Sequence, residues 1–227
     1  MIRVGVLIPS SNTVMERDLH REIDAVAEVH TARMYLADVS PDAEQRMVDD
    51  EALPAARRLA TASPDVLVFG CTSAGALHDA AYSERLDSQL AAAAGVRVVV
   101  GVLPSVIDAL AGYRAVALFT PYLPVLTSRV AERLRGAGVP VARTHSLGIT
   151  ANTVIGRLSP GDIADAVTGL DLHGIDALFL SCTNLRAYEA RERIAHSTGL
   201  PVITSNHAVT ERVRSLAVRS QREETWT

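Results

Sequence analysis

The sequence lacks the common short motifs of nucleotide and metal sites. Gly-x-Gly-x-x-Gly follows none of the predicted strands, which argues against a dinucleotide, and His-Glu-x-x-His is absent. Gly70 and Gly75 have the glycine spacing of a phosphate-binding loop. However, Ala76 and Leu77 stand where that loop requires lysine and serine or threonine. We therefore expect no nucleoside triphosphate site.

A metal site has little support in the sequence. Cys71 and His78 form a pair of possible ligands, but no further short-range ligand accompanies them. Zinc sites use three or four protein ligands. The other histidines have no evident partner, and only His207, beside a strand end, is a candidate for lining a site. We therefore expect no bound metal.

The chain also lacks basic runs and long apolar runs. Its formal charge of −4 and pI near 6.0 give no electrostatic reason to expect nucleic acid as a partner. No apolar run approaches the roughly 20 residues needed to cross a bilayer, so no membrane contact is expected. The first nine residues lack the long apolar region and cleavage site of a signal peptide. We expect a cytoplasmic protein with reduced thiols.

Each of the two cysteines follows a continuous apolar run. Asp65-Val-Leu-Val-Phe-Gly leads into Cys71-Thr, and Asp176-Ala-Leu-Phe-Leu-Ser leads into Cys182-Thr. Such runs predict strands that are buried on both faces. The cysteines therefore stand at the carboxyl ends of two strands, the edge at which open α/β sheets bind ligands. The same chemistry thus occurs once in each half of the chain.

Strand and helix patterns alternate along the whole chain. We expect strands at residues 4–8, 29–36, 66–70, 96–102, 115–120, 139–147, 177–181 and 199–205. Helices are expected between them, except for a loop at residues 38–42. This alternation is typical of parallel sheets. We expect an α/β fold of two similar lobes facing each other, with residues 1–112 plus 202–227 in the first and 113–201 in the second.

The two cysteines have an inert and a functional interpretation. Free cysteines are commonly buried as small hydrophobic residues. Here Cys71 and Cys182 occupy the same motif position, and both precede threonine at the functional edge of a predicted sheet. A thiol at a helix amino terminus has its thiolate stabilised by backbone N–H groups and the helix dipole. We therefore expect a pair of reactive thiols on opposite sides of one small ligand.

Several short segments together resemble the maleate cis-trans isomerase branch of the aspartate/glutamate racemase superfamily. This superfamily also contains arylmalonate decarboxylases and ectoine-utilisation proteins. The similarity runs nearly end to end and in order. The segments are Pro9-Ser-Ser-Asn12-Thr, Gly70-Cys71-Thr-Ser, Thr120-Pro-Tyr122, Ser181-Cys182-Thr-Asn-Leu185 and Ser205-Asn206.

The resemblance implies two pseudosymmetric Rossmann-like lobes, a site between them that needs no cofactor, and homo-oligomers of two or more chains. It implies that Cys71 is the nucleophile and Cys182 its partner acid. The decarboxylase branch has a small residue at the first cysteine position, so Cys71 counts against decarboxylation. The remaining matches are to residues that hold the substrate: Asn12, Tyr122 and Asn152 for the carboxylates, with Thr72, Ser73 and Thr183 as N–H or hydroxyl donors.

Thiol chemistry explains how such a site works on a small dicarboxylate. Addition of a thiolate to a cis-alkene makes the double bond single, and amide donors stabilise the charge that moves onto the neighbouring carboxylate. Rotation and loss of the thiolate then give the trans isomer. Two alternatives stay open: a two-cysteine racemase of the aspartate/glutamate type, and a non-catalytic protein that binds small acids. Asn12, Tyr122 and Asn152 also have structural alternatives, as a helix cap, a packed aromatic and a turn residue.

Overall fold

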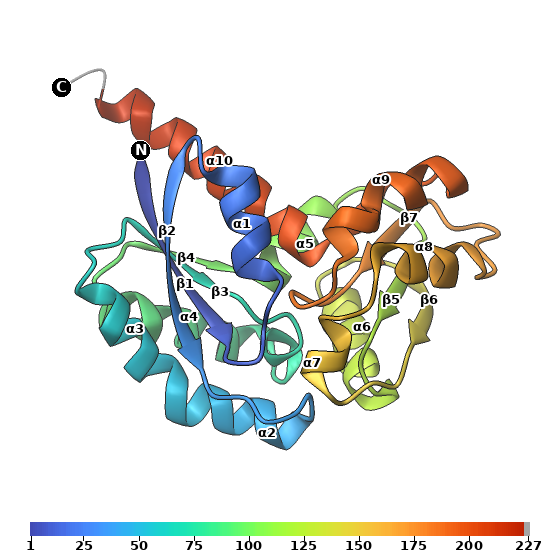
Figure 1. Cartoon of the computed structure of the whole chain (residues 1–227), viewed down its shortest axis with the longest axis horizontal. Coiled ribbons are helices and arrows are strands. Elements are labelled where there is room, and N and C mark those ends of the chain that lie inside the picture. The colour runs from blue at the N-terminus through green and yellow to red at the C-terminus, as the bar shows by residue number, and fades with distance from the viewer. Residues whose placement is uncertain (225–227) are drawn as a thin grey trace.

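The computed structural model describes residues 1–224, which form two lobes, each with a four-stranded parallel sheet (Figure 1). The first sheet has the order β2-β1-β3-β4, and the second has the order β6-β5-β7-β8. Both orders describe the same topology, so the second lobe repeats the first. The predicted α/β fold with two parallel sheets is confirmed. The strands are β1 (Ile2–Pro9), β2 (Ala27–Met34), β3 (Val66–Phe69), β4 (Val98–Gly101), β5 (Val116–Thr120), β6 (Val141–Ser146), β7 (Ala177–Leu180) and β8 (Val202–Thr204).

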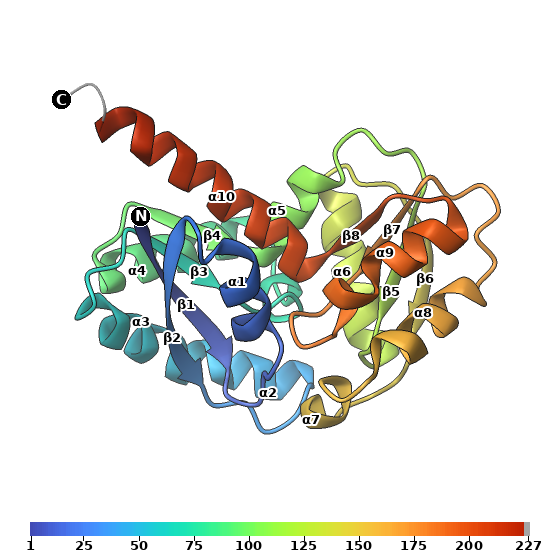
Figure 2. The ribbon, with the colours of Figure 1, turned by 45° about the horizontal axis from the view of Figure 1, so that its top comes forward.

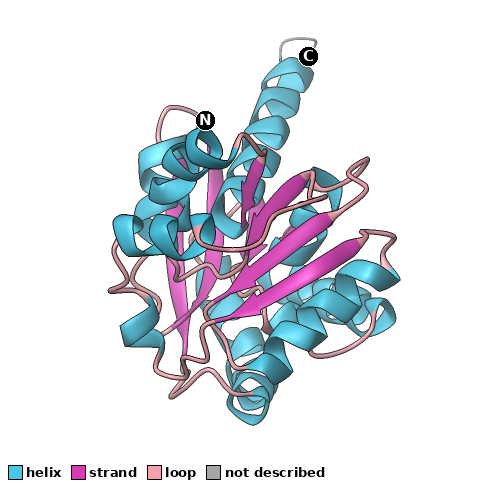
Figure 3. Cartoon of the chain, turned by 90° about the vertical axis from the view of Figure 1, so that its right-hand side faces the viewer, coloured by secondary structure: helices cyan, strands magenta, loops and turns pink. Residues whose placement is uncertain are grey.

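Helices cover both faces of each sheet (Figure 3). In the first lobe, α3 and α4 pack on one face, and α1 and α10 lie on the other. In the second lobe, α6 packs against β6, and α9 packs against β8 and α8. The helices are α1 (Met15–Ile23), α2 (Pro41–Arg46), α3 (Ala52–Ala60), α4 (Ala80–Ala94), α5 (Val102–Ala109), α6 (Pro124–Gly136), α7 (Asn152–Ile155), α8 (Pro160–Thr168), α9 (Ala187–Thr198) and α10 (Ser205–Glu224), with a π-helical turn at Met47–Glu51 and a 3₁₀ turn at Ala74–Ala76.

The central strands are buried on both faces, as their continuous apolar runs predict. Along β3, Val66 and Val68 face one apolar cluster, whereas Leu67 and Phe69 face another. This alternation follows from the two-residue period of a strand. The first of these clusters extends into the second lobe, where it includes Phe179 of β7. Apolar packing therefore joins the lobes and fixes the positions of the β3 and β7 ends.

The chain returns to the first lobe through α10. Figures 1 and 2 show this helix running from the second lobe across the first, where it packs against α1 and α5. The expected lobe boundary at residue 201 needs one correction, because Val202–Thr204 form β8 and pair with β7 of the second sheet. Residues 225–227 of the expected first lobe lie outside the described residues. The division into two domains stays a prediction.

The segment expected as a loop at residues 38–42 contains the start of a helix. Ser40 caps α2, and its side chain accepts a hydrogen bond from the backbone N–H of Ala43 at 3.4 Å. Pro41 occupies the first turn, where its missing N–H costs nothing. A serine cap followed by proline is a helix start signal, so the loop interpretation was wrong at this point. Helix α2 carries Glu44, whose side chain is buried.

No helix within residues 1–224 has both the length and the apolar character that a bilayer span requires.

Candidate active site

Cys71 and Cys182 line one cavity between the lobes. Cys71 is the second residue of the loop after β3, and Cys182 is the second residue of the loop after β7. The space among the lining residues is about 260 Å³, a volume that includes open solvent. Its lining contains every predicted site residue. The lining residues are Pro9, Asn12, Leu36, Val39, Glu44, Cys71, Thr72, Ser73, Tyr122, Asn152, Cys182, Thr183 and Asn184.

Hydrogen bonds between the lobes hold the two cysteine loops against each other. The Thr183 hydroxyl donates to the Gly70 carbonyl at 3.0 Å. The hydroxyls of Thr72 and Ser205 are 2.9 Å apart, and Ser205 also accepts from the backbone N–H of Cys182 at 3.1 Å. These groups are buried, so losing one partner would leave an unsatisfied polar atom in the interface. The relative position of the cysteines is therefore set by direct contacts of their own loops.

The close approach of the first loop to β1 requires glycine at position 70. A Cβ atom there would lie 2.7 Å from the Leu7 carbonyl oxygen and 2.7 Å from the Met15 sulfur. Real Cβ atoms essentially never show such short contacts. The equivalent position in the second lobe is Ser181, which is fully buried and whose hydroxyl has no hydrogen-bond partner among the described residues.

Both the oxygen and the amide nitrogen of the Asn12 side chain form hydrogen bonds within the protein. Its side-chain oxygen accepts from the backbone N–H groups of Val14 and Met15, both at 3.0 Å, at the start of α1. Its amide group donates to the Thr183 hydroxyl at 3.0 Å. The structural alternative, a cap for the first helix, is therefore present together with a place in the cavity wall.

Asn152 belongs to a buried amide cluster that includes a residue that sequence reasoning did not single out. Asn184 donates to the Asn152 carbonyl at 2.7 Å and to its side-chain oxygen at 2.9 Å. Asn184 also accepts from the backbone N–H of Thr13 at 2.8 Å, and Asn152 donates to the Ser11 hydroxyl at 2.9 Å. Its position directly after Cys182-Thr183 was a signal that could have identified it. The cluster joins residues of both lobes around the cavity wall.

Tyr122 lies in the loop after β5, where it is both packed in the interior and part of the cavity wall. It is 2% exposed and lines the cavity between the two thiols. Burial raises the pKa of its hydroxyl well above the ordinary value, and the nearby Cys182 and Cys71 raise this pKa further. Tyr122 is therefore a neutral hydrogen-bond donor at physiological pH.

The stabilised thiolate expected at Cys71 stays a prediction, because burial raises the pKa of this thiol while the backbone N–H of Ala74 lowers it. Burial, and then the nearby Glu44 carboxyl, raise the pKa of the Cys71 thiol far above its ordinary value. A 3₁₀ turn of only three residues follows the cysteine, so no long helix directs its dipole at the sulfur. The Cys71 thiol is 3.8 Å from the Ser73 hydroxyl. At neutral pH the resting site therefore holds a protonated thiol at this position.

Cys182 has a different environment. Burial raises the pKa of this thiol to about 11, although the Tyr122 hydroxyl and the backbone N–H of Asn184 act in the opposite direction. That N–H group donates to the Cys182 sulfur at 3.3 Å. The backbone φ of Cys182 is +134°, a conformation that costs a residue with a Cβ of order 1–3 kcal/mol. The second cysteine is thus strained, protonated and surrounded by donors.

Glu44 is the second functional candidate that sequence reasoning missed. It is 1% exposed, lines the cavity, and accepts a hydrogen bond from the Ser73 hydroxyl. Its other carboxyl oxygen is buried and has no partner among the described residues. Burial raises the pKa of Glu44 to about 8. No sequence motif marks this residue, because it reaches the site from a helix 29 positions before Ser73.

Two other candidates lie elsewhere. His78 is exposed and contacts the Gln45 side chain, and His207 of α10 packs against the Tyr188 ring of α9. Neither lines the cavity with the cysteines.

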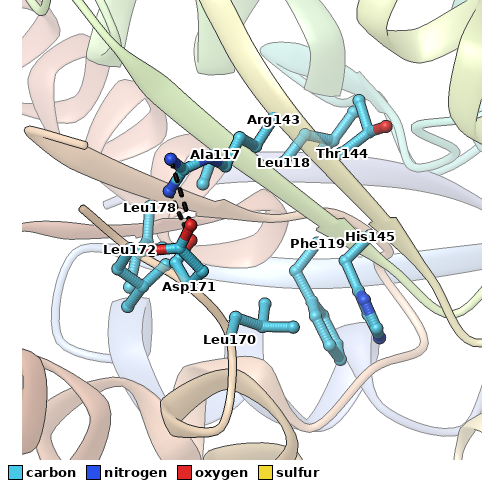
Figure 4. Close-up of a pocket in the computed structure, with 10 residues that line it drawn as sticks. All are labelled: Ala117, Leu118, Phe119, Arg143, Thr144, His145, Leu170, Asp171, Leu172 and Leu178. Atoms are coloured by element: carbon cyan, nitrogen blue, oxygen red, sulfur yellow. Dashed lines mark hydrogen bonds and ion pairs between the residues drawn. The ribbon is translucent and has the colours of Figure 1, made fainter. Parts of the chain in front are cut away.

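A separate hollow lies in the second lobe (Figure 4). It is lined by apolar residues of β5 and β7, by His145, which stacks on Phe119, and by the Arg143–Asp171 ion pair. None of the residues that line it carries a thiol. The cavity that contains both cysteines is therefore the candidate active site.

Comparisons with known proteins find a family and several solved structures that this chain resembles over most of its length. The family model described as arylmalonate decarboxylase matches residues 4–225. The maleate isomerase of Geobacillus stearothermophilus is 29% identical over 218 residues, which cover 89% of this chain and 86% of that protein. The maleate isomerase of Pseudomonas putida is 28% identical over 224 residues, with 92% and 89% covered. A solved cysteine-to-alanine variant of the maleate isomerase Iso from Pseudomonas putida S16, with maleate, aligns with a TM-score of 0.85 at 25% identity and covers 92% of this chain and 89% of that one.

Proposed function

The chain belongs to the arylmalonate decarboxylase family, and we propose that it is a cofactor-independent isomerase of maleate or a similar small dicarboxylate. The observation that carries the proposal is the single cavity shared by two thiols, one from each lobe. The sequence relatives named above are maleate isomerases, which supports an isomerase over the decarboxylase that gives the family its name. The presence of Cys71 points the same way.

In the proposed reaction, the Cys71 thiolate forms a carbon–sulfur bond with one alkene carbon. The alkene electron pair moves to the other carbon and its carboxylate, so the former double bond becomes a single bond. Rotation about this bond exchanges the cis and trans arrangements, and loss of the thiolate restores the alkene. Atoms and electrons balance without an oxidant, a reductant or a metal.

Cys182 has the role of the partner acid in this proposal. Its pKa of about 11 keeps it protonated at neutral pH, so it can protonate the carbon that becomes electron-rich and recover the proton before elimination. The Tyr122 hydroxyl and the Asn184 N–H group face the resulting sulfur charge. These donors stabilise the thiolate form while the proton is on the substrate.

Substrate carboxylates are bound by neutral donors in this proposal, because the cavity lining contains no arginine, lysine or histidine. The hydroxyls of Thr72 and Thr183 are already bonded to protein groups. Their backbone N–H groups donate to no protein acceptor among the described residues, so they are free for a carboxylate. Asn12 and Asn152 each use one amide N–H within the protein, so the second N–H of each can bind a carboxylate, together with the Tyr122 hydroxyl. Ser73 lies beside the nucleophile.

Proton NMR of the purified protein with maleate tests the proposal directly. We expect fumarate to appear without any added cofactor, and a chelator to leave the rate unchanged. Absence of fumarate, with maleate still bound, would identify a binding protein. Exchange of a Cα proton of a chiral acid with solvent deuterium, without alkene isomerisation, would identify a racemase.

We also propose a cytoplasmic location, which the two free thiols support. A homo-oligomer of two or more chains stays a prediction, and sedimentation velocity would measure it.

A further inference from the structure

Three buried groups form a chain from the first cysteine to a carboxyl group. The Cys71 sulfur is 3.8 Å from the Ser73 hydroxyl, and that hydroxyl donates to Glu44. Two of the three come from the loop after β3, whereas Glu44 comes from α2. All three are at least 95% buried and line the cavity. A thiol, a hydroxyl and a carboxyl in this order form a possible route for a proton.

We propose that Glu44 accepts the proton of the Cys71 thiol through the Ser73 hydroxyl and so generates the attacking thiolate. The inference rests on the proposed function, which requires a thiolate at Cys71. In the transfer, the Cys71 S–H bond breaks and its proton moves to the Ser73 oxygen. At the same time the Ser73 O–H bond breaks and its proton moves to Glu44. The sulfur keeps its electron pair, so one negative charge moves from the carboxylate to the thiolate.

Charge balance in the cavity favours this transfer over simple loss of a proton to solvent. The lining contains no cationic residue, so a thiolate formed beside an ionised Glu44 would add a second buried charge. Transfer within the chain keeps the number of charges constant. Burial raises the pKa of both groups, and the carboxyl lies closer to neutrality, at about 8. A fraction of Glu44 is therefore ionised at neutral pH and available as a base.

The position of α2 explains how a carboxyl group reaches this place. The segment before it contacts the second lobe, where the Val39 N–H donates to the Thr150 carbonyl at 2.9 Å. Figures 1 and 2 show α2 beside α7, below the gap between the lobes. Leu36 and Val39 of the same segment line the cavity with Glu44. The segment closes the cavity, and Glu44 is its one acidic lining residue.

Few charged or titratable groups act on Glu44. Arg129 on α6 is the one cation that lowers its pKa, and this effect and the Ser73 hydrogen bond are both smaller than the effect of burial. The other titratable groups of the cavity are the thiols of Cys71 and Cys182 and the Tyr122 hydroxyl. Because these groups stay neutral at physiological pH, Glu44 is the group expected to ionise between pH 7 and 9.

Alkylation of a single thiol tests the inference without using the proposed substrate. In a Cys182→Ser background, Cys71 is the one remaining thiol, and its reaction with iodoacetamide reports thiolate formation. We expect the rate to rise with pH around an apparent pKa near 8. Glu44→Gln keeps the size of the side chain and an oxygen for Ser73, but it cannot accept a proton. This variant should react at least about tenfold more slowly at pH 7.5, with a rate that keeps rising at higher pH.

Matched variants distinguish loss of the proton route from a general loss of folded structure. Asp42→Asn removes an exposed acid from the same helix and should leave the alkylation profile unchanged. Ser73→Ala should slow alkylation as Glu44→Gln does, and Ser73→Thr, which restores a hydroxyl, should recover part of the rate. Circular dichroism and thermal unfolding establish that each variant is folded.

Failure of the proton route and failure of the isomerase activity give different experimental results. If Glu44→Gln keeps the parent alkylation profile and the parent kcat/KM for maleate, the proton route is wrong while the isomerase stands. If alkylation depends on Glu44 but no maleate is converted, the route stands and the function is wrong. A kcat/KM that falls as pH rises through 8 would also overturn the route, because it would show that Glu44 acts in its protonated form.

Discussion

The two lobes place the same Cys-Thr sequence at the same point of the same sheet topology, yet the two thiols differ. Cys71 follows a glycine, has an ordinary φ, and faces Ser73 and a carboxyl group. Cys182 follows a buried serine, has a φ of +134°, and accepts a hydrogen bond from a backbone N–H. The first environment can take up a proton, and the second stabilises negative charge with donors. The internal repeat therefore places the two cysteines at equivalent positions, while the residues around each sulfur determine how that thiol reacts.

The largest expected effect separates the two thiols by their roles. Cys71→Ser should abolish both turnover and any covalent adduct, since serine is a far weaker nucleophile. Cys182→Ser should reduce turnover by about 10²–10⁴-fold, as expected for loss of a general acid, and should leave the adduct trapped. Intact-protein mass spectrometry after incubation with maleate measures the adduct. An adduct at Cys182 alone, in the parent protein, would reverse the roles.

The residues that precede the cysteines give the next largest contrast. Gly70→Ala should destabilise the protein by about 1–3 kcal/mol or more, because its Cβ would collide with the Leu7 carbonyl and the Met15 sulfur. Ser181→Ala should cost less than Gly70→Ala, because it removes one hydroxyl and adds no atom that could collide with a neighbour. Urea unfolding measures both free energies. Equal losses of unfolding free energy at positions 70 and 181 would show that the two strand ends are packed alike.

Glu44 gives the first lobe a pH dependence of stability between pH 4.5 and 8. Its pKa is about 8 in the folded protein, above the ordinary 4.5, so the folded state holds a proton that the unfolded chain has lost between these values. The contribution to stability is fully present below pH 4.5 and is lost as pH rises through 8.

The stability of Glu44→Gln should depend less on pH across this window than that of the parent. The difference should be of order 1 kcal/mol or more, since one pKa unit corresponds to about 1.4 kcal/mol. Chemical unfolding at pH 5, 7 and 9 measures it, with the exposed Asp42→Asn as control. Parallel curves for the parent and Glu44→Gln would contradict the shifted pKa.

The smallest expected effect concerns backbone strain. Cys182→Gly should be more stable than Cys182→Ala by about 1 kcal/mol, because glycine adopts a φ of +134° without a Cβ penalty. At position 71, where φ is not positive, Gly should be the less stable of the two. Thermal unfolding of the four variants compares the lobes directly. If glycine and alanine had the same order of stability at both positions, the predicted difference in backbone strain between the two cysteines would be wrong.

Much of the fold could be predicted because its patterns are local. The apolar runs before Cys71 and Cys182 mark buried strands whatever lies around them, and small residues after each run mark a strand end. One error was a misread local signal, because residues 38–42 were expected as a loop although Ser40 and Pro41 are typical of a helix start. The other depended on a neighbouring element, because pairing with β7 places Val202–Thr204 in the second lobe.

The candidate site was predicted as a set of residues but not as an environment. The cavity contains all eight residues named from the sequence. Asn184 was missed although it follows Cys182-Thr183, and Glu44 was missed because nothing in its own segment indicates the cavity. Its contact with Ser73 spans 29 positions, which no local pattern reports.

The sequence by itself determined the two strands, the cysteine at the carboxyl end of each, and the repetition that makes the halves alike. Hydrophobic periodicity and turn chemistry are properties of a short segment, so they can be read without knowing the packing. Only the tertiary structure decided that burial raises the pKa of both thiols, that Cys182 is strained, and that a carboxyl group lies near Cys71. Desolvation and charge act through space, and their size depends on which distant residues exclude water from each sulfur.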